Sequence, residues 1–176
     1  MSTTTTLPTK SENSSVQVVT PSSEQSKAPT FWQRWLTFEN IRKNRTPDFI
    51  IGDNYLRRWW IIPRNKWFNI YLHEINKSDD DRALHDHPWW NLSIVLKGGY
   101  DEVTPRGTFP RRAGQFIGRS GSSLHRLVIP DDGQAVTLFL TGPNYREWGF
   151  ACPKGWRKWE DFCATGNKGQ VGRGCE

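Results

Sequence analysis

The feature that most constrains the fold is a series of short apolar runs, each rich in aromatic and β-branched residues and bounded by turn residues. The runs occupy residues 55–63, 67–75, 92–103, 114–130, 135–143 and 146–153. Such residues favour strands, and turns about every eight to twelve residues are typical of a β-sandwich or barrel. The strand-like runs do not alternate with helical segments, as they would in a doubly wound sheet. We therefore expect an all-β domain of seven or eight short strands.

The N-terminal region differs in composition from the rest of the chain. Residues 1–29 are rich in Ser, Thr, Pro and Gln, and cannot bury enough apolar surface to offset the entropy of ordering, so we expect a disordered tail. Apolar side chains then recur at spacings typical of a short amphipathic helix, at Phe31, Trp32, Trp35, Leu36 and Ile41. We expect one barrel domain over residues 30–165 and a flexible tail over 166–176.

Charge and cysteine content limit the possible binding partners and the cellular compartment of the protein. The formal charge of +6 permits an anionic substrate, but the basic residues form no long stripe, so a nucleic-acid partner is not expected. Cys152, Cys163 and Cys175 form no CxxC motif, so we expect no disulfide framework and a reducing compartment. No apolar run reaches the ~20 residues of a membrane helix, and no signal peptide is evident. We expect a cytoplasmic protein.

The histidines are the main candidates for chemistry. The chain has four of them: His73, His85, His87 and His125. On a strand, residues i and i+2 point to the same face, so His85 and His87 can converge on one point while Asp86 points away. Imidazole is a common metal ligand at neutral pH. The H-x-H pair therefore indicates a candidate metal site.

The spacing around these histidines resembles the two motifs of the cupin superfamily, G-x5-H-x-H-x3-4-E-x6-G and G-x5-P-x-G-x2-H-x3-N. The resemblance covers roughly residues 70–150. It implies a cupin-type double-stranded β-helix, a jelly-roll barrel, in which a divalent metal is bound by His85, His87 and His125. It also implies that Gly98 and Gly114 are bend glycines.

The sequence departs from the cupin pattern at several positions. Asn91 stands in place of the glutamate ligand, Ser120 and Ser122 in place of the proline and glycine, and Ile129 in place of the asparagine. The first motif's leading glycine is also absent. A three-histidine site without the carboxylate is similar to that of thiol dioxygenases such as cysteine dioxygenase, which use ferrous iron and dioxygen. Three neutral ligands leave the metal more positive, which favours an anionic thiolate. Fe(II) is the expected cofactor, with Ni, Mn or Zn as alternatives.

A longer stretch, from RRWWIIP through HDHPWW to GPNYREWGF, resembles a group of small cupin-like proteins of bacteria and bacteriophages. That group supports the fold more than any substrate. Because dimers are frequent among cupins, the resemblance also allows a homodimer.

Several further residues are candidates for the site. His73 and Tyr71 share a strand face, so His73 can be a fourth ligand, an acid–base group or simply a hydrogen-bonded strand histidine. Tyr71 and Tyr100 can donate a proton or orient dioxygen, or can simply be packed aromatics. Asn91 can orient a ligand without binding the metal. Glu102 can replace the missing carboxylate ligand. The run Asp79 to Asp81 reads as a solvated turn.

Arginines are the candidates for holding a substrate carboxylate through a bidentate fork. We favour Arg57 and Arg146 over Arg58 for this role, and Tyr100 as a further substrate contact.

Three functions remain open at this point. The first is a mononuclear iron dioxygenase that acts on a small thiol or carboxylate. The second is a metal-independent sugar-nucleotide epimerase or isomerase, which chelation would leave fully active. The third is a non-enzymatic ligand-binding or phage accessory module. The resemblance favours the first, although one fold can host many chemistries.

Overall fold

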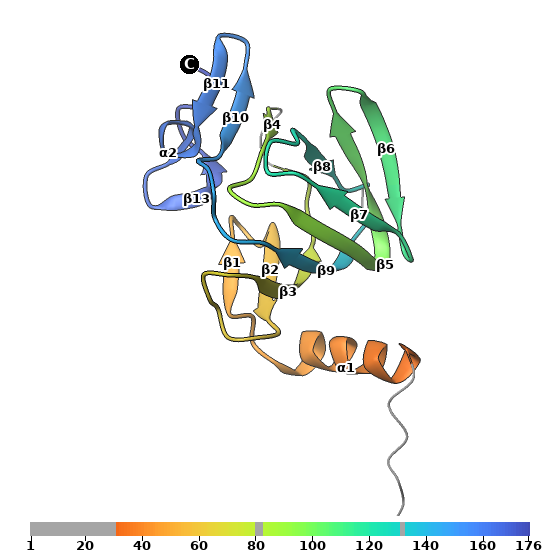
Figure 1. Cartoon of the computed structure of the whole chain (residues 1–176). Coiled ribbons are helices and arrows are strands. Elements are labelled where there is room, and N and C mark those ends of the chain that lie inside the picture. The colour runs from red at the N-terminus through yellow and green to blue at the C-terminus, as the bar shows by residue number, and fades with distance from the viewer. Residues whose placement is uncertain (1–30, 80–82, 131–132) are drawn as a thin grey trace, which may run out of the picture.

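The fold is that of a computed structural model, which describes residues 31–79, 83–130 and 133–176. The tail expected over residues 1–29 lies outside the described residues. Figure 1 shows a helix followed by strands, with a second short helix near the C-terminus. In chain order the elements are α1 (Phe31–Asn44), β1 (Phe49–Ile51), β2 (Leu56–Trp60), β3 (Asn69–Ile75), β4 (Leu84–His85), β5 (Asn91–Thr104), β6 (Gly107–Arg112), β7 (Phe116–Arg119), β8 (Arg126–Val128), β9 (Ala135–Thr141), β10 (Gly149–Cys152), β11 (Gly155–Lys158), α2 (Trp159–Phe162), β12 (Cys163–Ala164) and β13 (Asn167–Val171).

The main sheet is antiparallel and curls into a half-barrel (Figure 1). Its strand order is β1-β2-β3-β9-β5-β6, and β7 and β8 also pair with β5. The expected all-β fold with an N-terminal helix is confirmed. The described residues hold thirteen strands rather than seven or eight, because strands of two or three residues such as β4 and β12 are too short to show a pattern in the sequence.

The bend in β5 is what curls the sheet. The first half of this strand pairs with β9 and β7, and the second half pairs with β6 and β8. Gly98 lies at the change of partner with a φ of 64°, and a Cβ there would lie 1.8 Å from the carbonyl oxygen of Gln134. Only glycine fits both conditions without strain. The expected bend at Gly98 is therefore confirmed, and Gly114 also has a positive φ, of 92°.

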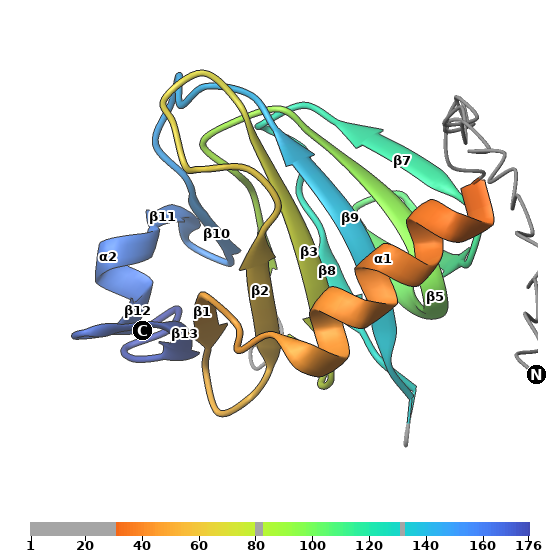
Figure 2. The same ribbon diagram turned by 90° about the horizontal axis from the view of Figure 1, so that it is seen from below.

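Helix α1 covers the outer face of the sheet, where it lies across β3, β9 and β5 (Figure 2). Phe38 and Ile41 pack there against a cluster formed by Trp59, Leu72 and Val136. The helix expected from the sequence is confirmed, but Leu36 is 64% exposed and lies off the packed face.

The inner face of the sheet carries a second apolar cluster and leaves room for a site. Its buried members are Leu56, Ile75, Val95, Tyr100, Ile117, Ile129 and Ala135. Because alternate residues of β3 point to opposite faces, Tyr71 and His73 face inward while Leu72 packs outward. The sequence-predicted facing of this strand is confirmed.

The C-terminal elements form a separate layer beside the half-barrel (Figure 1). Strand β10 pairs with β11 and with β4, and the ring of Phe150 stacks on Phe162 with centroids 3.7 Å apart. This layer therefore fixes the position of β4, which begins the histidine motif.

A disulfide joins Cys152 to Cys175, with Cα atoms 5.4 Å apart. The sequence analysis expected no disulfide framework and did not foresee this single crosslink, because the two cysteines are brought together by the turn back of β12 and β13, which the sequence pattern does not reveal. The segment expected to be a flexible tail, residues 166–176, contains β13 and this crosslink. Within the described residues, no helix has both the length and the apolar character needed to cross a bilayer.

Candidate metal centre

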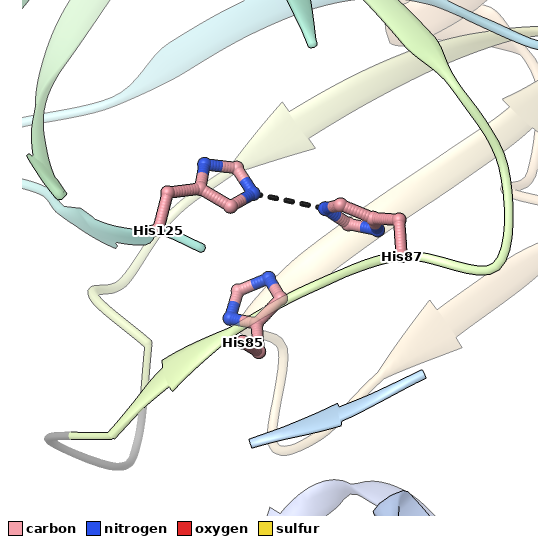
Figure 3. A group of neighbouring side chains, drawn as sticks. All are labelled: His85, His87 and His125. Atoms are coloured by element: carbon pink, nitrogen blue, oxygen red, sulfur yellow. Dashed lines mark hydrogen bonds between the residues drawn. The ribbon is translucent and has the colours of Figure 1, made fainter. Parts of the chain in front are cut away.

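Three histidines from two distant segments converge on one point (Figure 3). His85 lies on β4, His87 follows that strand, and His125 immediately precedes β8. His85 and His125 form an antiparallel bridge in which each backbone N–H donates to the other's carbonyl at 2.9 Å. One ligand nitrogen from each ring lies within 4.8 Å of the others. The sequence-predicted convergence of the three is confirmed.

The spacing of the ring nitrogens fits a shared metal ion. The Nε2 atoms of His87 and His125 lie 2.9 Å apart. Two nitrogens bound at about 2.1 Å to one metal and at right angles would lie about 3 Å apart. The ring centroid of His85 is 4.9 Å from that of His125 and 5.2 Å from that of His87. The three rings thus surround one small volume.

Glu102 sets the orientation of His125. The Nδ1 of His125 donates to the Glu102 carboxylate at 3.0 Å, which leaves the lone pair of Nε2 directed toward His87. Arg119 and Arg111 also donate to this carboxylate through their Nε atoms. Glu102 therefore orients His125 through the ring nitrogen that faces away from the other histidines. It does not join the three-histidine group as a metal ligand, which the sequence had left open.

Burial keeps two of the imidazoles neutral, as metal binding requires. Desolvation, together with the nearby His125 and His85, lowers the pKa of His87 well below its usual value. Desolvation also lowers the pKa of His125 to about 4, although its hydrogen bond to Glu102 opposes the shift. Burial alone would raise the pKa of Glu102, but its hydrogen bonds from His125 and Arg119 hold that pKa far below the usual range.

Asp86 and Arg146 fix the loop between the two adjacent ligands. The buried Asp86 accepts hydrogen bonds from the backbone N–H of Gly149 and from Arg146 Nη1, both at 2.7 Å. The same Arg146 nitrogen donates to the carbonyl of His87 at 3.1 Å. Arg146 borders the cavity, but its charge is already paired with Asp86.

Asp79 supports the third ligand from the other side. One of its carboxylate oxygens lies 3.7 Å from His85 Nδ1 and accepts the backbone N–H of Leu127 at 2.7 Å. The other oxygen accepts the hydroxyl of Tyr55. The side chain of Asp79 is only 5% exposed, so its assignment to a solvated turn was wrong. Asp80 and Asp81 lie outside the described residues.

The histidines face a cavity of about 1390 Å³ on the inner side of the sheet. His73 and Tyr100 also line it. His73 lies outside the three-histidine group, and its Nε2 accepts a hydrogen bond from Arg58 Nε at 2.8 Å. Desolvation, aided by Arg58, lowers the pKa of His73 well below its usual value. Tyr71 stacks on His73 with ring centroids 5.8 Å apart.

Asn91 lies deep in the barrel at the start of β5, 1% exposed. Its Oδ1 accepts a weak hydrogen bond from Arg119 Nη1 at 3.4 Å, and Arg119 Nη2 lies 3.4 Å from the hydroxyl of Tyr100. Among the described residues, Nδ2 of Asn91 and Nε1 of Trp89 are the two buried side-chain atoms without a hydrogen-bond partner. Arg119 therefore joins Asn91, Tyr100 and Glu102, a role that no local sequence pattern indicated.

Arg57 does not reach the cavity, unlike the other arginines considered for substrate binding. Its side chain is 42% exposed and pairs with Glu74 at 3.1 Å on the outer face of the sheet. The next residue, Arg58, points inward and lines the cavity. Since neighbouring residues on a strand point to opposite faces, one arginine of the pair reaches the cavity and the other does not.

Comparisons with known proteins find similarity in fold only. No protein-family model and no curated protein matches the sequence. Solved structures that match include a cupin-2 domain protein of Rhodospirillum rubrum (15% identity, 57% of this chain and 68% of the other, TM-score 0.49). Others are the polyketide cyclase RemF of Streptomyces resistomycificus (19%, 55% and 75%, TM-score 0.45) and a cupin 2 conserved barrel domain protein of Salinispora arenicola (18%, 54% and 81%, TM-score 0.42). At these values they carry no information on substrate or reaction.

Proposed function

We propose that this chain is a metal-binding cupin that holds one divalent metal ion through His85, His87 and His125. The observation that carries the proposal is the convergence of three ring nitrogens within 4.8 Å, one of them oriented by a buried carboxylate. A histidine whose second nitrogen donates to a carboxylate is the usual arrangement at metal sites, because the carboxylate fixes the tautomer and strengthens the ligand. The three residues fit a transition metal better than Ca²⁺ or Mg²⁺, which prefer oxygen ligands.

We further propose that the metal is Fe(II) and that the protein is a dioxygenase acting on a small substrate. A ferrous ion with three neutral ligands would supply the redox chemistry that dioxygen requires and would keep positions open for substrate. For a thiol substrate, both atoms of one dioxygen are added to give a sulfinic acid. Sulfur is oxidised, dioxygen is reduced, and no other reductant is consumed.

The surrounding residues would position the reactants. Glu102 holds His125, and Arg146 with Asp86 holds the loop that carries His87. Phe139 and Trp89 flank His87, with ring centroids 6.3 and 6.2 Å away, and give the site aromatic walls. Such walls exclude water and leave the metal's open side to a small ligand.

The metal-independent isomerase receives less support from the contacts. That mechanism needs His73 or Tyr71 as a group free to move a proton at the substrate. Nε2 of His73 is already the acceptor for Arg58, and Arg58 also lies 4.7 Å from the centroid of the Tyr71 ring. A pair engaged in this way is poorly placed to act as acid and base.

Metal content is the first test. Protein purified anaerobically without an affinity tag should contain close to one iron per chain, and His87→Ala should lose it. His73→Ala is the matched control, because it removes a buried histidine of the same cavity that lies outside the group. No metal in the wild type after reconstitution would overturn the proposal.

Oxygen uptake by the iron-loaded protein tests the finer part of the proposal. Uptake should depend on one member of a panel of small thiols, including cysteine, and should vanish with chelation. Metal binding without uptake for any thiol would reject the thiol dioxygenase and leave the metal site standing. Catalysis that survives chelation would instead favour the isomerase.

A further inference from the structure

Four arginines line the described part of the cavity, and they differ in how their charges are balanced. Arg119 pairs with Glu102, and Arg146 pairs with Asp86. Exposed Arg64 lies over the ring of Trp60, 5.7 Å from its centroid. The fourth is Arg58, for which the residues that the structure describes offer no carboxylate within ion-pair distance.

The contacts of Arg58 leave its outer donors available. Nε donates to His73 at 2.8 Å, and the guanidinium lies over the ring of Tyr71 at 4.7 Å. Neither terminal nitrogen has a hydrogen-bond acceptor in the described part of the chain. A guanidinium presents two terminal groups in a planar fork that matches a carboxylate or a phosphate.

We propose that Arg58 binds an anionic group of the substrate, and that the substrate is therefore a small organic carboxylate or phosphate. The inference rests on the proposed function, because the same cavity holds the three histidines. It changes the expected residue from Arg57 or Arg146, which the sequence favoured, to Arg58, the inward-facing neighbour of Arg57.

The cost of an unpaired cation in this position supports the proposal. Desolvation lowers the pKa of Arg58 to about 10, which means that its surroundings oppose the charge. Stacking on Tyr71 offsets part of that cost. A buried charge is normally compensated by a partner of opposite sign, and here the cavity side is where one can approach.

Arg58 and the metal centre are close enough for one small molecule to reach both. Phe139 contacts both sides, with its ring centroid 6.3 Å from that of His87 and 4.9 Å from that of His73. His73 in turn contacts Arg58 directly. A ligand lying along Phe139 could place its reactive end at the histidines and its anionic end at Arg58.

The test compares a carboxylate with its neutral counterpart on metal-free, full-length protein, where the anion cannot bind to a metal instead. The probes are para-fluorobenzoate and para-fluorobenzamide, followed by fluorine NMR, with acetate and inorganic phosphate as competitors that distinguish the two kinds of anion. Wild type should bind the carboxylate at least about tenfold more tightly than the amide.

Variants of two neighbouring arginines identify the residue. Arg58→Met should weaken carboxylate binding by about 10- to 100-fold, the loss typical of a charge-assisted pair, and Arg58→Lys should lose less. Arg57→Met is the matched control. It removes the same charge from the next residue of the strand, but on the outer face, and should bind the probe as wild type does.

Each outcome decides the question. Equal binding of carboxylate and amide, equal losses in Arg57→Met and Arg58→Met, or no binding of any probe anion to wild type would overturn the inference. If Arg58→Met fails to fold, the comparison of the two probes and Arg58→Lys still decide. Anion selectivity in a protein that takes up no metal would overturn the proposed function alone, and metal uptake without anion selectivity would overturn this inference alone.

Discussion

Replacing Glu102 with glutamine should weaken metal binding while leaving all three ligands in place. The carboxylate accepts the Nδ1 proton of His125 at 3.0 Å, and it is 3% exposed. Glutamine keeps the shape and loses the charge that makes His125 a stronger ligand. Loss of a partner of this kind typically costs about 10- to 100-fold in metal affinity, or roughly 1.4 to 2.8 kcal/mol.

The same substitution should also destabilise the fold, which must be separated from the effect on the metal. Arg119 is 6% exposed and would lose its charged partner. Breaking a buried ion pair in this way typically costs about 3 to 5 kcal/mol. A variant that is partly unfolded would bind less metal for that reason alone.

Glu74→Gln is a control matched to this problem. Glu74 is also 3% exposed and also pairs with two arginines, Arg42 and Arg57, but on the outer face of the sheet. It should lower the free energy of unfolding by a comparable amount. Because it contacts no member of the three-histidine group, its metal affinity should stay at the wild-type value.

The measurement is competition with a chromophoric chelator for Co(II) under native conditions, with urea unfolding of the metal-free proteins alongside. The expected result is a lower metal affinity in Glu102→Gln alone and a lower stability in both variants. A Glu102→Gln affinity within twofold of wild type would refute the role of the carboxylate. Equal losses of affinity in both variants would show that stability, not ligand orientation, is responsible.

Three other predictions concern the frame of the site. Cys175→Ser should lower the free energy of unfolding by about 3 kcal/mol, and reductant should lower the melting temperature of wild type to that of the variant without affecting the variant. Gly98→Ala should destabilise by at least about 2 kcal/mol, because it adds a clash at a positive φ, whereas Gly118→Ala, with open space around it, should change little in the same unfolding assay. His73 stays neutral when folded but takes up a proton below pH 6.5 when unfolded, so metal-free wild type should lose stability as pH falls from about 6.5. His73→Asn, which removes this group from beside Arg58 and Tyr71, should make the loss of stability between pH 7 and pH 5 smaller by about 2 kcal/mol in urea unfolding.

The predictions from sequence that hold are those where one local pattern determines the outcome. The alternation of β3 placed Tyr71 and His73 on one face, and the spacing of His85 and His87 made their convergence probable from strand geometry alone. Gly98 was identifiable because a bend of this kind excludes a side chain. None of these required knowledge of which strands pair.

Contacts between distant strands could not be predicted from the sequence. Glu102 meets His125 because β5 pairs with β8, and it meets Arg119 because the other half of β5 pairs with β7. A carboxylate in the middle of a strand could as well have been a ligand, which is why that alternative stayed open. The choice between Arg57 and Arg58 likewise depends on which face α1 covers.

The charges in the cavity link the site to its ligand. Of the three carboxylates beside the histidines, Asp86 and Glu102 are already paired with arginines, and Asp79, 3.7 Å from His85, can offset one further positive charge. A divalent metal on three neutral imidazoles would add two positive charges, and Arg58 contributes a third. Since proteins do not leave such charge uncompensated in a partly buried cavity, the charge that Asp79 does not offset calls for negative groups on the ligand. This is why we expect both the metal and Arg58 to select for negative charge on the same small molecule.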